Sequence, residues 1–273
     1  MKKWEDAPTR SADVAGARFV YRQLGPTTGV PAIMLNHWGA VLDNFDPRIV
    51  DGLAATRPVI ALDYRGVGAS SGKARLTVAE MAEDSIAFIR ALDFEEVDPL
   101  GLSLGGFVAQ DIVLKEPGLV RKVILTRTGP ARGEGIEKVG AVSWPLIIKG
   151  MLTLQDHLFF TSTSNGRRSA RHFLDRLKQR KADRDKPITM AAFLRQLKAI
   201  KAWGKGPPQD LGTIRKPVLV MAMTISWCLA AIQSTWRGAC RIRNASFTRT
   251  PGTGGIFQYH EAFVSKTLEF LAR

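Results

Sequence analysis

The sequence contains little cysteine and no long apolar run. Its two cysteines, Cys228 and Cys240, cannot form the disulfide framework typical of small secreted domains. No stretch reaches the roughly 20 apolar residues that a membrane-spanning helix needs. The charged start, residues 1–6, is not followed by the apolar segment of a secretory signal. We therefore expect a cytoplasmic protein that has no membrane partner.

Acidic residues are missing from one part of the chain. None lies in the 50 residues between Asp210 and Glu261, where about five would be expected from the 25 acids among 273 residues. Both cysteines and two of the six tryptophans fall in the same stretch. Its composition therefore differs from that of the rest of the chain.

Basic residues outnumber acidic ones. The formal net charge is +14, and much of the excess falls in residues 167–205. Such a charge can indicate nucleic-acid binding, but the chain has no helix-turn-helix or RNA-recognition signature, and a positive helix face is more often solvated. We therefore expect no nucleic-acid partner; salt-sensitive binding to DNA or RNA would contradict this.

Apolar β-type runs alternate with helical patterns up to about residue 130. This alternation predicts an α/β protein with a mostly parallel, doubly wound sheet. Thr77 and Glu80 form a capping box at the start of one predicted helix. The predicted strands cover residues 19–24, 31–35, 59–62, 97–100, 122–125 and 217–221, and the predicted helices cover 43–56, 77–92, 107–114, 169–180, 189–203 and 263–271.

Helical patterns alone occupy the middle of the chain, and strand character returns only at 217–221. We therefore expect two units: a core formed by residues 1–132 and 211–273, and a helical cap formed by residues 133–210. The apolar faces of the cap helices should pack on each other and on the core.

The sequence Gly-Leu-Ser-Leu-Gly-Gly at residues 101–106 is the strongest local signal. It lies between a predicted strand and a predicted helix, and G-x-S-x-G in that setting is a nucleophile elbow, a sharp turn that exposes a serine hydroxyl. Ser103 is therefore a candidate nucleophile.

Two further motifs accompany the elbow. Residues 63–70 read D-x-R-G-x-G-x-S after a predicted strand, and residues 35–39 read Leu-Asn-His-Trp-Gly after another. With these motifs the chain resembles the α/β-hydrolase superfamily, close to its serine esterase, lactonase and cofactor-free haloperoxidase-like branch. The resemblance extends over nearly the whole chain.

The resemblance implies the α/β-hydrolase fold and a mechanism. Ser103 would attack the carbonyl of a small-molecule acyl substrate, and the backbone N–H groups of Trp38 and Leu104 would stabilise the oxyanion. His37 would line the site and shape its loop rather than act as a base. The resemblance implies no cofactor and no metal, and a monomer or homodimer.

The acid and histidine that should activate the serine are missing. Ile225 stands at the expected position of the acid, and Thr253 stands where the family has the histidine of G-H-G. Neither side chain can orient or accept a proton as those roles require. Of the four histidines, none of His157, His172 and His260 offers a convincing replacement.

A pair of compensating frameshifts over residues 221–253 would explain both anomalies. Read one base earlier, the codons must encode glycine at position 222, aspartate at 224 and valine at 228. They also permit aspartate at 225, proline at 229 and histidine at 253, which restores the family motif. True divergence is the alternative, and the coding DNA distinguishes the two.

Two functions remain open. The first is a serine hydrolase of esters, lactones or related acyl compounds, impaired because its acid and histidine are absent. The second is a non-catalytic hydrolase-fold protein that binds a small apolar ligand.

Overall fold

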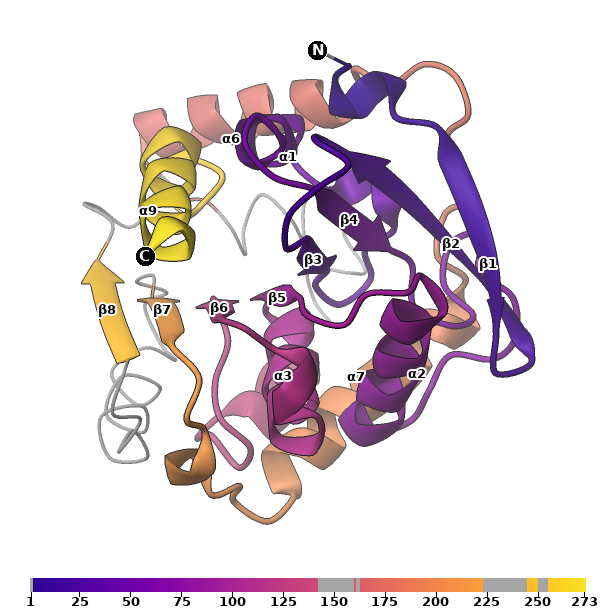
Figure 1. Ribbon diagram of the computed structural model, residues 1–273, viewed down its shortest axis with the longest axis vertical. Coiled ribbons are helices and arrows are strands. Elements are labelled where there is room, and N and C mark those ends of the chain that lie inside the picture. The colour runs from indigo at the N-terminus through magenta and orange to yellow at the C-terminus, as the bar shows by residue number, and fades with distance from the viewer. Residues whose placement is uncertain (1, 142–159, 161–162, 223–244, 250–254) are drawn as a thin grey trace.

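A mixed sheet forms the centre of the described structure (Figure 1). The computed structural model describes residues 2–141, 160, 163–222, 245–249 and 255–273. Within them the strand order is β1-β2-β4-β3-β5-β6-β7-β8. The strands are β1 (Thr9–Val14), β2 (Ala17–Leu24), β3 (Ala32–Leu35), β4 (Val59–Leu62), β5 (Asp98–Leu102), β6 (Val123–Thr126), β7 (Val218–Ala222) and β8 (Ala245–Arg249).

The sheet is antiparallel only at one edge. β2 pairs antiparallel with β1 and with β4, and the pairs from β4 through β3, β5, β6 and β7 to β8 are parallel. Every residue of β3, β4 and β6 is buried, as expected of parallel strands that are covered on both faces. Successive residues of β3 and β4 contribute to two hydrophobic clusters, one on each face. The predicted doubly wound α/β fold is therefore confirmed.

Helices cover both faces of the sheet. Figure 1 shows α1 and α9 on one face and α2 and α3 on the other. The predicted capping box begins α2: Thr77 Oγ1 accepts from the Glu80 N–H at 3.2 Å, and Glu80 Oε2 accepts from the Thr77 N–H at 3.1 Å. The described α-helices are α1 (Pro47–Ala54), α2 (Val78–Ala91), α3 (Leu104–Lys115), α6 (Ser164–Leu177), α7 (Met190–Lys205) and α9 (His260–Ala272), and the 3-10 helices are η1 (Trp4–Asp6), η2 (Leu42–Asn44), η3 (Pro117–Leu119), η4 (Ile136–Lys138) and η5 (Leu211–Thr213).

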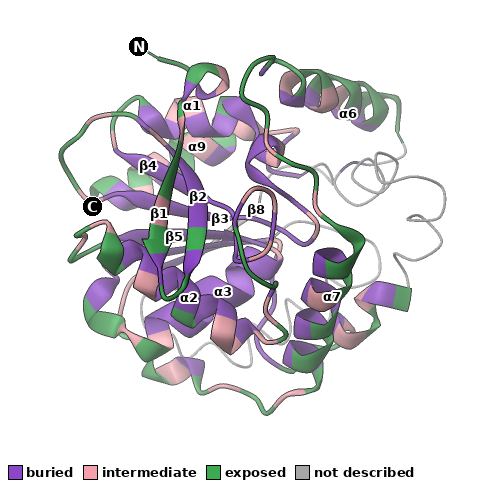
Figure 2. Ribbon diagram, turned by 90° about the vertical axis from the view of Figure 1, so that its right-hand side faces the viewer, coloured by how far each residue is buried: buried purple, intermediate pink, exposed green. Residues whose placement is uncertain are grey.

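The chain between β6 and β7 carries α6 and α7, which lie along one side of the core (Figure 2). Each begins at a threonine cap: Thr163 Oγ1 accepts from Gly166 N–H at 3.1 Å and Thr189 Oγ1 from Ala192 N–H at 3.2 Å. None of the described helices is long and apolar enough to cross a bilayer.

Two arginines of the basic segment hold this inserted chain on the core. Arg176 makes two hydrogen bonds to Asp46, at 2.9 and 2.6 Å, and Arg180 donates to the backbone oxygens of Glu5 and Ala7 at 3.0 and 2.9 Å. The expectation of a solvated positive face is therefore wrong for Arg176 and Arg180. Buried charges must be paired or hydrogen-bonded, and a partner 130 residues away supplies that pairing for Arg176.

Candidate active site

Ser103 occupies a strained turn between β5 and α3. Its backbone has φ 54° and ψ −113°, a conformation that costs a non-glycine residue on the order of 1–3 kcal/mol. Two neighbours on the β6 side hold it: the Ser103 N–H donates to Thr126 O, and Thr128 Oγ1 donates to Ser103 O, both at 2.9 Å. The residue is half-buried. This is the geometry of a nucleophile elbow.

The glycines around Ser103 allow three segments of the chain to meet. A Cβ atom on Gly101 would lie 2.3 Å from Gly105 O, and one on Gly105 would lie 2.0 Å from Leu35 O. A Cβ on Gly106 would lie 2.5 Å from the Thr128 side chain. Only glycine fits these positions, so β3, the elbow and the turn after β6 lie in direct contact.

The loop after β3 therefore begins beside the first turn of α3. Asn36 stabilises this loop, because its Oδ1 accepts from the His37 N–H at 2.9 Å and its Nδ2 donates to Val41 O at 3.2 Å. Trp38 is 8% exposed, and its ring stacks on Phe193 of α7 with centroids 4.3 Å apart. We refer to residues 36–39 as the oxyanion loop, after the role expected for Trp38.

His37 is buried within the oxyanion loop. Its Nδ1 lies 2.9 Å from Trp38 O and must donate, because a carbonyl oxygen can only accept. Burial lowers the pKa of His37 to about 4; the bond to Trp38 O opposes this shift and the charge of Arg127 adds to it. The imidazole is therefore neutral at pH 7. Its role in shaping the loop remains a prediction.

The two positions expected for the acid and the base, Ile225 and Thr253, lie outside the described residues. Position 225 comes three residues after the end of β7, and position 253 comes four residues after the end of β8. In the described part of the chain, no hydrogen bond joins Ser103 Oγ to a histidine or a carboxylate, and no group of three metal-binding side chains is present. His172 is exposed on α6, and burial lowers the pKa of His260 at the start of α9.

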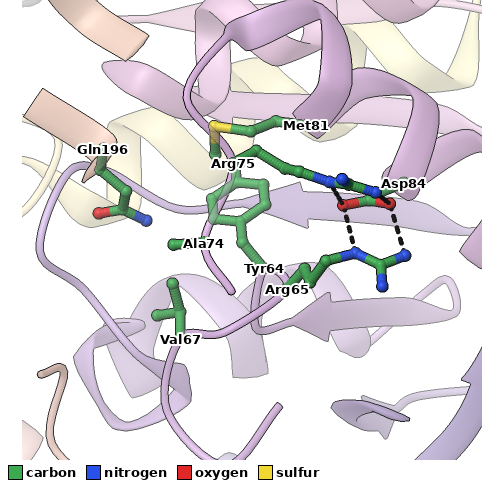
Figure 3. A pocket seen from close by; sticks show the side chains of 8 residues that line it. All are labelled: Tyr64, Arg65, Val67, Ala74, Arg75, Met81, Asp84 and Gln196. Atoms are coloured by element: carbon green, nitrogen blue, oxygen red, sulfur yellow. Dashed lines mark hydrogen bonds and ion pairs between the residues drawn. The ribbon is translucent and has the colours of Figure 1, made fainter. Parts of the chain in front are cut away.

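The D-x-R-G-x-G-x-S motif proves to be structural. Arg65 makes two hydrogen bonds to Asp84 of α2, at 2.9 and 2.8 Å, and Arg75 binds the same carboxylate (Figure 3). Ser70 Oγ accepts from the Val20 N–H at 2.8 Å and donates to Asp63 O at 3.1 Å. The motif thus ties the loop after β4 to α2 and β2.

No sequence pattern indicates that Asp185 meets Asp63. Asp185 accepts backbone hydrogen bonds from Leu42 at 3.1 Å and Ala69 at 3.0 Å, which brings it to the buried Asp63 carboxyl. A Cβ on Gly68 would lie 2.2 Å from Asp63 Oδ2 and 2.6 Å from Asp185 Oδ2. Burial, followed by the neighbouring Asp185 carboxylate, raises the pKa of Asp63 well above its usual value.

We expect Asp63→Asn to change how stability depends on pH. The protonated form of Asp63 stabilises the fold, because its pKa is higher in the folded than in the unfolded chain. That contribution is complete below about pH 4 and is lost as the pH rises through the folded pKa. Asparagine cannot ionise, so the variant should gain melting temperature relative to the parent chain between pH 4 and pH 8. Thermal melts across this range, with exposed Asp13→Asn as control, measure the difference, and parallel curves would contradict it.

Comparison with known proteins identifies relatives over the whole chain. The family described as "Alpha/beta hydrolase family" matches residues 35–266. An alpha/beta hydrolase fold protein from Chitinophaga pinensis superposes with a TM-score of 0.93 at 31% identity, over 99% of both chains. The enol-lactonase from Burkholderia xenovorans superposes with a TM-score of 0.72 at 18% identity, over 97% of this chain and 100% of that one, and indicates a shared fold alone.

Among curated proteins, the non-heme chloroperoxidase of Streptomyces lividans is 33% identical over 119 residues. The match covers 42% of this chain and 42% of that protein. The chain thus aligns with about two fifths of the length of its curated relatives.

Proposed function

The chain belongs to the alpha/beta hydrolase family, and from this premise we propose that it is a serine hydrolase of small ester, lactone or related acyl substrates, with Ser103 as nucleophile. The observation that carries the proposal is the backbone of Ser103, with φ 54° at a turn between β5 and α3. A strained turn of this kind is expected where a hydroxyl must face a substrate.

The chemistry follows from the surroundings of Ser103. Its Oγ would add to the substrate carbonyl carbon while its proton passes to water, and the carbonyl oxygen would take up the negative charge. Collapse of this adduct would break the bond to the leaving alcohol, and water would then hydrolyse the acyl-Ser103 ester. The backbone N–H groups of Leu104 and Trp38 would donate to that oxygen, and the positive end of α3 would stabilise the charge further. Residues 133–210 would form the cap over the acyl group.

We also propose that the activity of this chain is impaired. The carboxyl ends of parallel strands meet at one edge of a sheet, so residues that follow β7 and β8 are expected near the residue that follows β5. At positions 225 and 253 the sequence has isoleucine and threonine. Without a base the Ser103 hydroxyl stays protonated at pH 7, and loss of a whole triad costs on the order of a million-fold in turnover.

Ile225 and Thr253 also favour the second candidate, a non-catalytic protein that binds a small apolar ligand, because neither can act as the acid or the base of a triad. The two proposals differ in what they predict for Ser103. An impaired hydrolase still forms an acyl-enzyme slowly, whereas a binding protein forms none.

We expect slow acetylation of Ser103 by p-nitrophenyl acetate. Release of p-nitrophenol should exceed that of Ser103→Ala, and mass spectrometry should find the acetyl group on the peptide that carries Ser103. Turnover at rates usual for serine esterases would contradict the impairment. Equal rates in both chains and no acetyl peptide would reject the hydrolase and leave the binding protein.

A further inference from the structure

Helix α7 contacts the oxyanion loop through three interactions. Trp38 Nε1 donates to Phe193 O at 2.9 Å, and the rings of these two residues stack with an interplanar angle of 26°. The Gly39 N–H donates to Gln196 Oε1, also at 2.9 Å. The Trp38 side chain and the Gly39 N–H are thus both attached to one helix of the inserted segment, while Trp38 O is bonded to His37 Nδ1 within the loop.

The loop depends on these contacts because Gly39 has no side chain to fix it. Gly39 has φ +78°, a conformation that favours glycine, and a Cβ there would lie 2.8 Å from the Phe193 ring. The close approach of the loop to α7 requires glycine at position 39. The Gly39 N–H then provides the polar contact between the loop and the helix. Gly39 directly follows Trp38 in the chain. A shift of Gly39 would therefore also reorient the backbone of Trp38, whose N–H is the proposed oxyanion donor.

Gln196 is a polar residue in a buried position, and its bond to the Gly39 N–H is the feature that favours glutamine there. Its side chain is 1% exposed, and its Nε2 has no hydrogen-bond partner among the described residues. Figure 3 shows the amide nitrogen turned towards Ala74 and Tyr64, across a pocket that Val67 and Met81 also line. A buried amide without a partner opposes folding, so an apolar side chain of similar shape would pack there at less cost.

The orientation of the amide is fixed by chemistry. A backbone N–H can only donate, so the atom that faces Gly39 must be the oxygen of Gln196. What glutamine supplies at this position, and methionine would not, is that one acceptor.

We propose that Gln196 is a positioning residue that holds the oxyanion loop in the shape needed to stabilise an oxyanion on the Ser103 adduct. Gln196 itself touches neither the substrate nor Ser103, and acts through Gly39. The inference rests on the proposed function of Ser103. It adds that the inserted helix α7, besides covering the core, sets the geometry of the site.

The test compares Gln196→Met, which removes the acceptor, with Gln196→Glu, which keeps an oxygen in the same place. Gln209→Met is the matched control. Gln209 donates to Asp111 at 2.8 Å and also has a buried amide atom without a partner in the described structure, but its partner lies on α3 rather than on the loop. Amide hydrogen exchange at Gly39 is read by NMR, and kcat and KM are read with p-nitrophenyl acetate.

In Gln196→Met the Gly39 amide should exchange about tenfold faster or more, because its hydrogen bond is lost. The kcat should fall by about tenfold to a hundredfold with KM unchanged, since a small displacement of the loop acts on the transition state. Gln196→Glu should restore the slow exchange, and Gln209→Met should change neither quantity.

Two results would overturn the inference: unchanged exchange at Gly39 in Gln196→Met, or faster exchange with kcat within twofold of the parent chain. The exchange measurement also decides the matter if turnover is too slow to resolve. Failure of the proposed function is separate, because it shows as equal hydrolysis by the parent chain and Ser103→Ala.

Discussion

Restoring the acid and the histidine should raise the esterase turnover of the chain by about a thousandfold to a million-fold. The change replaces residues 221–253 by the sequence that the gene encodes one base earlier, which permits aspartate at position 225 and histidine at 253. The histidine would then accept the proton of Ser103, and the carboxylate would orient the imidazole. Initial rates with p-nitrophenyl acetate measure the gain.

Two controls give this result its meaning. Ser103→Ala in the restored chain should return the rate to that of the unrestored chain, since a general base without a nucleophile supplies little of the gain. Ile225→Asp with Thr253→His, made in the otherwise unchanged chain, separates the chemistry from the repair of the whole segment.

A restored chain no faster than the parent, although folded to the same degree, would contradict the proposed triad positions. Coding DNA whose earlier frame lacks glycine at position 222, aspartate at 224 and valine at 228 would contradict the frameshift hypothesis.

The fold could be predicted from the sequence where local signals agree with the tertiary structure. The strand predicted at 59–62 is β4, and residues 101–106 span the junction of β5 and α3, with Ser103 at the turn as expected. The sequence does not predict a strand where the residues carry no local strand signal and only pairing with a neighbouring strand forms it. The sequence does not predict β1, because five of its six residues, Thr9 to Asp13, are half or fully exposed and lack a clear apolar alternation. Only the pairing with β2 makes this segment a strand. β8, in the stretch without acids, was also not predicted.

The site could be predicted only as far as its contacts are local. The elbow and the oxyanion loop each follow from a few consecutive residues. The contacts of Gln196 with Gly39 and of Asp185 with Asp63 join residues more than 100 positions apart. Neither glutamine nor aspartate in the helical segment has a pattern that marks such a partner. The contribution that we propose for α7 therefore depends on contacts that only the folded chain brings together.

The elbow itself should be the part of the fold least tolerant of added volume. We expect Gly105→Ala to destabilise the protein by about 3 kcal/mol or more. A Cβ there would lie 2.0 Å from Leu35 O and 2.4 Å from Leu35 C, and these backbone atoms of β3 cannot move without shifting the strand. Helix propensity alone predicts the opposite sign, because alanine is better than glycine inside a helix by about 1 kcal/mol. Urea unfolding at constant pH decides which effect is larger.

Gly118→Ala is the matched control, because nothing lies within 4 Å of a Cβ at Gly118. There the loss of conformational freedom in the unfolded chain should stabilise the protein by about 0.4–1 kcal/mol. The two substitutions are chemically identical, so opposite signs would show that contact with β3, rather than any general property of glycine, determines residue 105. Since Leu35 directly precedes Asn36, the clash should also displace the oxyanion loop. Any folded Gly105→Ala protein should then acetylate Ser103 more slowly than Gly118→Ala, and equal acetylation would separate the packing of the elbow from the geometry of the loop.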